Sequence, residues 1–168
     1  MSLALRIVRA TENDAAVLLH MIRELAEYEH LADQVQATED SLRESLFGKA
    51  PCAEAAIAYV DETAVGFALW FQNYSTFLGR AGLYLEDLFV LPDWRRQGIG
   101  RRLLSYVAAV AVAKQSGRME WSVLDWNDPA IRVYRGIGAQ AMDQWTVYRL
   151  TGEALESLAG DGTAARQK

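Results

Sequence analysis

The segment from Leu83 to Ser116 constrains the fold most, because it changes from strand to helix across a short basic turn. Residues 83–91 are apolar except for two acids, a pattern typical of a strand covered on both faces. From Ile99 onward, apolar residues recur at helical spacing. The turn and the start of the helix carry glycines and arginines, namely Arg95, Arg96, Gly98, Gly100, Arg101 and Arg102.

This turn has the composition of a phosphate-binding site. A helix N-terminus presents unpaired N–H groups and the positive end of the helix dipole, and glycine allows an oxyanion to approach the backbone. Two nucleotide-binding motifs do not fit: the third glycine of a dinucleotide fingerprint is replaced by Leu103, and Gly100 is followed by Arg101 rather than by the lysine of a P-loop. The alternative is an ordinary strand–helix corner whose arginines face solvent.

Composition favours a globular protein and restricts its partners. The 168 residues are expected to form one domain over 1–160, with a disordered tail over 161–168. The net charge of -5 argues against nucleic acid and is compatible with a cationic substrate. No long apolar run or signal peptide is recognised, so no membrane association and a cytoplasmic location are expected. Cys52 is the single cysteine and histidines lack ligand spacing, so no metal site is expected.

The order of the expected elements indicates a mixed α/β domain. Residues 55–60 and 64–72 form an expected hairpin, and residues 73–82 an expected loop. In the second half, strand–helix–strand order implies a parallel crossover. The other expected strands are 3–8, 83–90, 119–124 and 145–150. The expected helices begin near Thr11, at Thr38 or Asp40, near Ile99 and at Asp128.

The basic turn, Arg95-Arg96-Gln97-Gly98-Ile99-Gly100, is similar to the Arg/Gln-x-x-Gly-x-Gly/Ala motif of the GNAT superfamily of N-acetyltransferases. Further segments match in the same register, so that the resemblance covers residues 5 to 150. They are Glu24 to Glu29, Tyr84 to Asp87, Leu124 to Pro129 and Val133 to Ala139. Together they resemble the diamine (spermidine/spermine-type) branch, which includes thialysine acetyltransferases. The resemblance implies a single-domain mixed sheet with flanking helices, the GNAT (acyl-CoA N-acyltransferase) fold.

The resemblance also implies acetyl-coenzyme A as co-substrate, with its pyrophosphate on the basic turn. In the family, the strand before the turn separates from its neighbour, so that main-chain groups reach the pantetheine arm. The implied cofactor-binding residues are Leu88, Phe89, Val90, Arg95, Arg96, Gln97, Gly98, Ile99, Gly100, Asn127 and Tyr134.

Two residues are expected to carry the chemistry through this resemblance. Glu86 resembles the residue that receives the substrate ammonium and relays its proton, and Tyr134 the general acid that protonates the coenzyme A thiolate. Tyr28 and Glu29 resemble substrate-binding residues, to which Glu86 and Asp87 are added. For Asp87 a structural salt bridge to an arginine is an equal alternative, and for Tyr134 the alternative is core packing.

The sequence therefore predicts an enzyme that moves the acetyl group of acetyl-coenzyme A to a primary amine of a small cationic substrate, such as a polyamine, a diamine or thialysine. Acetylation of a peptide or protein amine is the enzymatic alternative. A non-catalytic acyl-coenzyme A sensor is the other. The diamine branch implies a homodimer. No residue pattern specifies which amine is acetylated.

Overall fold

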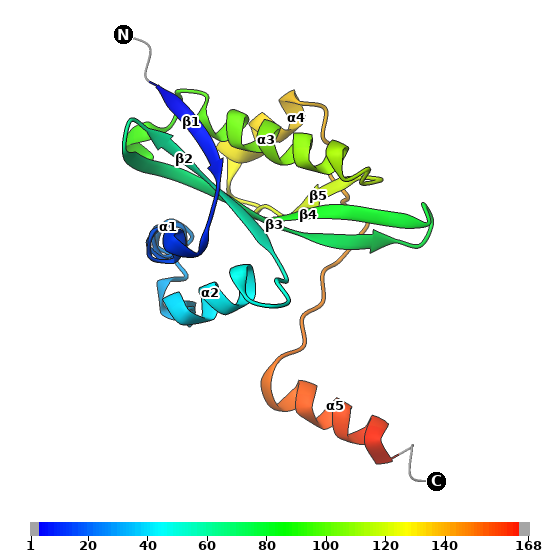
Figure 1. The fold of residues 1–168 in the computed structure, drawn as a ribbon. Coiled ribbons are helices and arrows are strands. Elements are labelled where there is room, and N and C mark those ends of the chain that lie inside the picture. The colour runs from blue at the N-terminus through cyan, green and yellow to red at the C-terminus, as the bar shows by residue number, and fades with distance from the viewer. Residues whose placement is uncertain (1–3, 165–168) are drawn as a thin grey trace. The chain divides into compact units, whose positions relative to one another are not determined.

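The computed structural model describes residues 4–164, which group into two compact units that divide after Asn127. The first unit contains a five-stranded sheet in the order β1-β2-β3-β4-β5 (Figure 1). Neighbouring strands from β1 to β4 are antiparallel, whereas β5 runs parallel to β4. This mixed sheet confirms the predicted α/β class. The strands are β1 (Leu5–Arg9), β2 (Glu54–Val60), β3 (Thr63–Ser75), β4 (Arg80–Val90) and β5 (Met119–Trp121).

Helices cover both faces of this sheet. α1 (Ala15–Tyr28) and α2 (Glu39–Phe47) lie on one face and α3 (Ile99–Ala113) on the other (Figure 1). The helix start predicted at Thr11 forms as a short 3-10 turn, in which the Asp14 carboxylate accepts the Thr11 N–H at 2.7 Å. At α2 the Thr38 hydroxyl accepts the Ser41 N–H at 3.1 Å, which satisfies one of the unpaired donors of the first turn.

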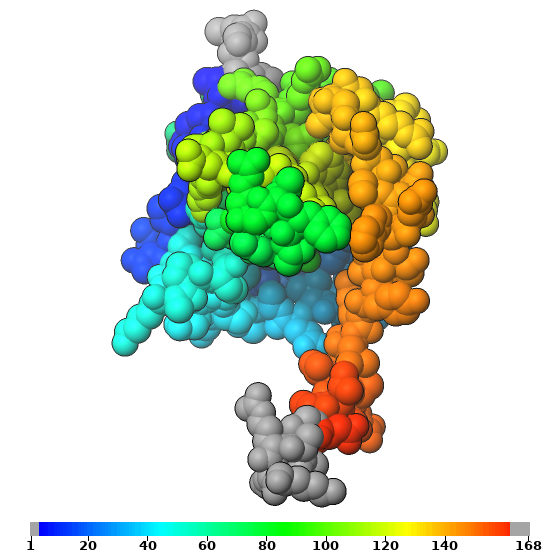
Figure 2. Space-filling view, turned by 90° about the vertical axis from the view of Figure 1, so that its right-hand side faces the viewer, coloured from blue at the N-terminus to red at the C-terminus, as the bar shows by residue number. Residues whose placement is uncertain are grey.

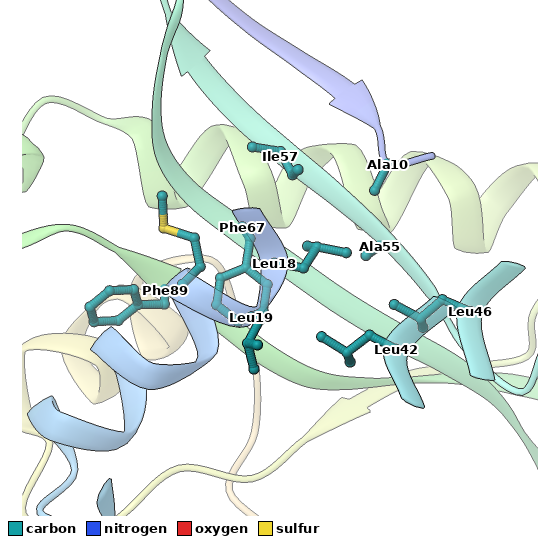
Figure 3. Close-up of a cluster of buried hydrophobic side chains, with 10 residues drawn as sticks. Ala10, Leu18, Leu19, Leu42, Leu46, Ala55, Ile57, Phe67 and Phe89 are labelled. Atoms are coloured by element: carbon teal, nitrogen blue, oxygen red, sulfur yellow. The ribbon is translucent and has the colours of Figure 1, made fainter. Parts of the chain in front are cut away.

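A hydrophobic core joins α1 and α2 to the sheet. Side chains from both helices meet strand residues in one buried cluster (Figure 3). Phe67 of β3 and Phe89 of β4 are directly paired in the sheet and are 0% and 4% exposed, respectively. Burial of such side chains removes apolar surface from water and stabilises the fold. Phe89 therefore fixes the end of β4 just before the basic turn.

A β-bulge interrupts β4 where its acidic residues lie. Leu85 pairs with Trp70 and Asp87 with Leu69, so Glu86 is the extra residue of the bulge. Trp70 contacts Tyr106 of α3, whereas Leu69 packs against the core below α1. Asp87 therefore faces α1, on the side opposite Leu85.

The loop predicted over 73–82 is wrong, because the hairpin continues almost to its tip. Tyr74 pairs with Ala81 and Ser75 with Arg80, which leaves four residues for the turn. Gly82 permits this pairing, because a Cβ there would lie 2.4 Å from the Asn73 Oδ1. The polar residues and the glycine at the ends of these strands interrupt the hydrophobic pattern, so that pattern does not indicate that the strand pairing continues here. The hairpin tip faces the viewer in Figure 2, in green, and Phe77 there is 96% exposed.

The second unit begins at Asp128 and contains α4 (Asp128–Gly136) and α5 (Gly152–Ala164). The strand predicted over 145–150 is wrong, because no strand of residues 4–164 pairs with that segment. The strand predicted over 119–124 ends at Trp121, and the helix predicted to Ser116 ends at Ala113. Residues 161–164 of the predicted tail belong to α5, and residues 165–168 lie outside the described part of the chain.

Close approach of β3 and β4 yields a test of stability. Gly66 lies opposite Val90, and a Cβ at Gly66 would lie 2.6 Å from the Phe89 carbonyl oxygen. We expect Gly66→Ala to lower the free energy of unfolding by about 1–3 kcal/mol, because the strands must separate to admit the methyl group. Urea unfolding measures this change.

Gly100→Ala provides the matched control for this test. A Cβ at Gly100 would meet Val90 Cγ2 at 3.7 Å and Leu88 Cδ2 at 3.8 Å, which are ordinary contacts. Alanine also favours helix over glycine, so stability should stay equal or rise by up to about 1 kcal/mol. Equal loss of stability in both variants would contradict the steric argument.

Candidate active site

The first turn of α3 has its N–H groups open. Gly98 is the residue before the helix and has a φ of 79°, in the left-handed region that glycine adopts without strain. Because Gly98 supplies no side-chain cap, the N–H groups of Ile99, Gly100 and Arg101 have no bonding partner within residues 4–164. Nothing lies within 4 Å of a Cβ built at Gly98. This turn can therefore accept an anion.

A second set of open main-chain groups lies along β4. The parallel ladder to β5 ends at Leu85, whereas the ladder to β3 continues to Val90. The Leu91 N–H donates to the Val65 carbonyl, so by alternation the main-chain groups of Leu88 and Val90 point away from β3. Phe89 instead uses its main chain toward β3. The predicted strand separation is thus present, and its open edge consists of the main chain of Leu88 and the N–H of Val90, whose carbonyl accepts from Arg95.

The arginines of the turn differ in direction. Arg95 is half-buried, and its Nε donates to the Val90 carbonyl oxygen at 2.9 Å. Arg96, Gln97 and Arg101 are exposed around the open turn. Arg96 has a φ of 61°, so left-handed positions on either side of Gln97, at 96 and 98, shape the loop. The positive side chains that face solvent at this helix start favour binding of a phosphate-bearing ligand.

Tyr28, at the end of α1, lies among several residues that the sequence analysis selected. Its hydroxyl donates to the Asn127 Oδ1 at 3.3 Å, and its ring centroid is 6.2 Å from that of Phe89. The Arg95 guanidinium carbon lies 4.1 Å from the centre of the same ring. Residues from α1, β4, the basic turn and the segment after β5 therefore meet here.

Three carboxylates interact beside this cluster. Burial, and then the charges of Glu86 and Glu29, raise the pKa of Asp87 from 3.8 to about 7. Burial also raises the pKa of Glu29, whereas Glu86 is exposed in the bulge. No arginine ion pair to Asp87 occurs within the described residues, so the structural salt bridge considered for Asp87 does not form there. These three carboxylates can attract an ammonium ion, and Asp87, with its raised pKa, can accept a proton.

Tyr134 lies on α4, in the second unit. Burial raises the pKa of its phenol above the ordinary value of 10.0. A raised pKa keeps the hydroxyl protonated at neutral pH, as a proton donor requires.

Trp126 is a candidate site residue that the sequence analysis did not select. It is 51% exposed, and its ring lies 5.6 Å from that of Tyr28 and 6.3 Å from that of His30. Its position next to Asn127 in a matched segment was the available signal. By contrast Trp70, at 1% exposure, is a core residue.

No group of three His, Cys, Asp or Glu side chains within residues 4–164 is arranged to hold a metal ion. Nor does any helix in the described part of the chain have the length and apolar character needed to cross a membrane.

Comparison with known proteins identifies similar chains. The model of the Acetyltransferase (GNAT) family matches residues 18–139. A thialysine N-epsilon-acetyltransferase of Bos taurus is 40% identical over 162 residues, covering 90% of this chain and 95% of that protein. An L-ornithine N5-acetyltransferase of Arabidopsis thaliana is 31% identical over 198 residues, covering 91% of this chain and 87% of that protein. The structure of an integron cassette protein from V. cholerae gives a TM-score of 0.79 at 25% identity, covering 94% and 99% of the two chains.

The raised pKa of Asp87 predicts a pH dependence of stability. Because the folded pKa lies above the unfolded value of 3.8, the folded state binds more protons between about pH 4 and 7, and stability falls with rising pH over that window. We expect Asp87→Asn to raise the free energy of unfolding at pH 8 by about 1–3 kcal/mol, with the gain vanishing below about pH 4. Urea unfolding across this pH range measures it.

Glu86→Gln is the control for this titration, because it removes the neighbouring carboxylate from an exposed position. Because the charge of Glu86 raises the pKa of Asp87, its removal should raise the free energy of unfolding at pH 8 as well, but by less than Asp87→Asn does. Wild-type and Asp87→Asn stability curves that run parallel from pH 4 to 8 would show that Asp87 titrates normally.

Proposed function

The chain belongs to the GNAT acetyltransferase family, and we propose that it is an acetyl-coenzyme A-dependent N-acetyltransferase acting on a primary amine of a small cationic substrate. Polyamines, diamines and thialysine-like amino acids are the substrate class. The names of the relatives support this class, because both thialysine and ornithine carry a side-chain amine. The match extends over most of the chain and most of each relative, so the comparison concerns the whole fold.

The observation that carries this proposal is the open first turn of α3 beside the open edge of β4. The side chains of Leu88 and Val90 lie against Gly100, so the first turn of α3 packs on the stretch of β4 that carries the open edge. The turn would hold the diphosphate of coenzyme A through backbone N–H groups and exposed arginines, and Leu88 and Val90 would bind the pantetheine arm. When bound, the co-substrate supplies the acetyl group as a thioester.

The carboxylates supply the amine side of the reaction. An alkylammonium ion has an ordinary pKa of about 10.4, so it must lose a proton before its nitrogen can attack. Asp87, Glu29 and Glu86 attract the cation, and a carboxylate with a pKa near neutrality is suited to accept its proton. Glu86 is proposed to receive the ammonium and relay its proton, while Tyr28, Glu29 and Asp87 bind the substrate.

Tyr134 is proposed as the general acid that protonates the departing thiolate. Its phenol is protonated at neutral pH, which supports this role. Asn127 is proposed to bind the cofactor near the pantetheine or diphosphate.

Two larger-scale features belong to the same proposal. The family match from 18 to 139 continues across the division after Asn127, which supports one functional domain over residues 1–160. The likeness to the diamine branch supports a homodimer. An isologous interface of this kind buries the same surface patch on both copies.

A thiol-release assay with acetyl-coenzyme A tests the activity directly. Polyamines, diamines, thialysine, ornithine, neutral amino acids and peptides are compared at equal concentration. We expect turnover with at least one small cationic amine and little with neutral amino acids, because the site is rich in carboxylates. Turnover that is highest with a peptide N-terminus would favour the protein-acetylating alternative. Coenzyme A binding without turnover would favour a sensor.

The Tyr134→Phe substitution tests the general acid. It retains the ring and removes the hydroxyl proton, so kcat with the accepted amine should fall by roughly 10²–10⁴-fold. Coenzyme A affinity, measured by calorimetry, should change no more than a few-fold. Tyr148→Phe is the matched control, because Tyr148 is an exposed tyrosine outside the proposed site. Near-normal turnover of Tyr134→Phe would leave Tyr134 as a packing residue.

A further inference from the structure

The side chain of Arg95 turns away from the solvent-facing side of the basic loop. Its Nε donates to the Val90 carbonyl oxygen at 2.9 Å. Its guanidinium carbon lies 4.1 Å from the ring centre of Tyr28 and 5.4 Å from that of Phe89. Arg96, the next residue, is exposed. The Arg95 side chain therefore contacts the protein, whereas the Arg96 side chain faces solvent.

The bond to Val90 fixes Arg95 against the open edge of β4. By the alternation described above, the Val90 carbonyl points away from β3 toward that edge. Arg95 satisfies this acceptor, so the carbonyl is not exposed as a lone unpaired group. A guanidinium is planar and can donate from its Nε while its flat face lies on an aromatic ring.

The Tyr28 ring is the second group that Arg95 holds. A cation over an aromatic face is attracted by the ring quadrupole, more strongly where water is displaced. The ring also contacts Phe89 and Trp126, and its hydroxyl donates to Asn127. Glu29 follows Tyr28 directly in the chain and interacts electrostatically with Asp87. The position of Tyr28 therefore affects where the carboxylates receive an amine.

We propose that Arg95 is a positioning residue for the amine side of the site: its side chain joins the Val90 carbonyl to the Tyr28 ring and does not bind the diphosphate of coenzyme A. This inference rests on the proposed function. It gives the two adjacent arginines different roles: the Arg96 side chain binds the cofactor, and the Arg95 side chain positions the Tyr28 ring against which the amine binds. The main chain of Arg95 remains part of the cofactor loop.

Substitutions at position 95 separate the two contacts of its side chain. Arg95→Gln keeps an N–H donor for the Val90 carbonyl but removes the cation from the Tyr28 ring. Arg95→Lys keeps the charge and loses the planar group. The amine KM should rise by about 3- to 30-fold in Arg95→Gln, the range expected for loss of a cation–π contact, and by less in Arg95→Lys. Coenzyme A affinity should remain within about twofold.

Arg96→Gln is the comparison variant, because it removes the same charge from the adjacent exposed side chain. It should weaken coenzyme A binding in calorimetry and leave the amine KM unchanged. Arg43→Gln on α2, where Arg43 pairs with Glu39 and Asp40, should leave both quantities unchanged. If Arg95→Gln does not fold, Arg95→Lys provides the same comparison of KM with affinity.

A double-mutant cycle with Tyr28→Leu tests whether Arg95 acts through the ring. Once the ring is absent, Arg95→Gln should have little further effect on the amine KM, so the two changes should be non-additive. Additive effects, or weaker coenzyme A binding with an unchanged amine KM, would overturn the inference. A chain that acetylates no amine contradicts the proposed function itself, whereas an active chain with an unchanged amine KM in Arg95→Gln contradicts only the role of Arg95.

Discussion

The unequal pairing of the two edges of β4 is the constraint on which the rest of the site depends. Pairing with β3 continues past the bulge to Val90, but pairing with β5 ends five residues earlier, at Leu85. A strand in this state is rigid and still has main-chain donors and acceptors to offer. The buried Phe89 side chain secures the end of the strand without using the open edge. The stretch from Leu88 to Val90 is therefore held rigidly by β3 while part of its main chain stays available for a ligand.

The site also separates charge across the sheet. Leu88 and Val90 face α3, where the open helix start and exposed arginines favour a polyanion. Asp87 faces α1, where burial and the charges of Glu86 and Glu29 raise its pKa, and these carboxylates favour a cation. A single strand therefore has opposite electrostatic preferences on its two sides, as a reaction between an anionic cofactor and a cationic amine requires. Tyr28, which contacts residues from several segments, lies where these surroundings meet.

Local sequence signals predicted much of this arrangement. The resemblance to the GNAT family is confirmed by the family match over residues 18–139. The predicted mixed sheet and the helix start at Thr11 are present, and of the two starts considered for the next helix, Thr38 and Asp40, the structure uses Thr38. The elements predicted wrongly depend on non-local pairing: the ladder beyond Gln72 is tolerated through Gly82, and the segment 145–150 has strand composition without a strand beside it. The inward direction of Arg95 could not be predicted either, because a charged residue in a basic turn carries no sign of the ring that it will contact. The roles of Glu86 and Tyr134 stay predictions.

The bulge in β4 has a consequence for how such a site can be acquired. Leu85 and Asp87 already lie opposite consecutive residues of β3, so the ladder on either side would remain in register if Glu86 were absent. A one-residue insertion at this point adds a carboxylate while every other side chain of the sheet retains its face. A new acidic group can therefore enter a finished scaffold through a single codon, with no rebuilding of the core that supports it.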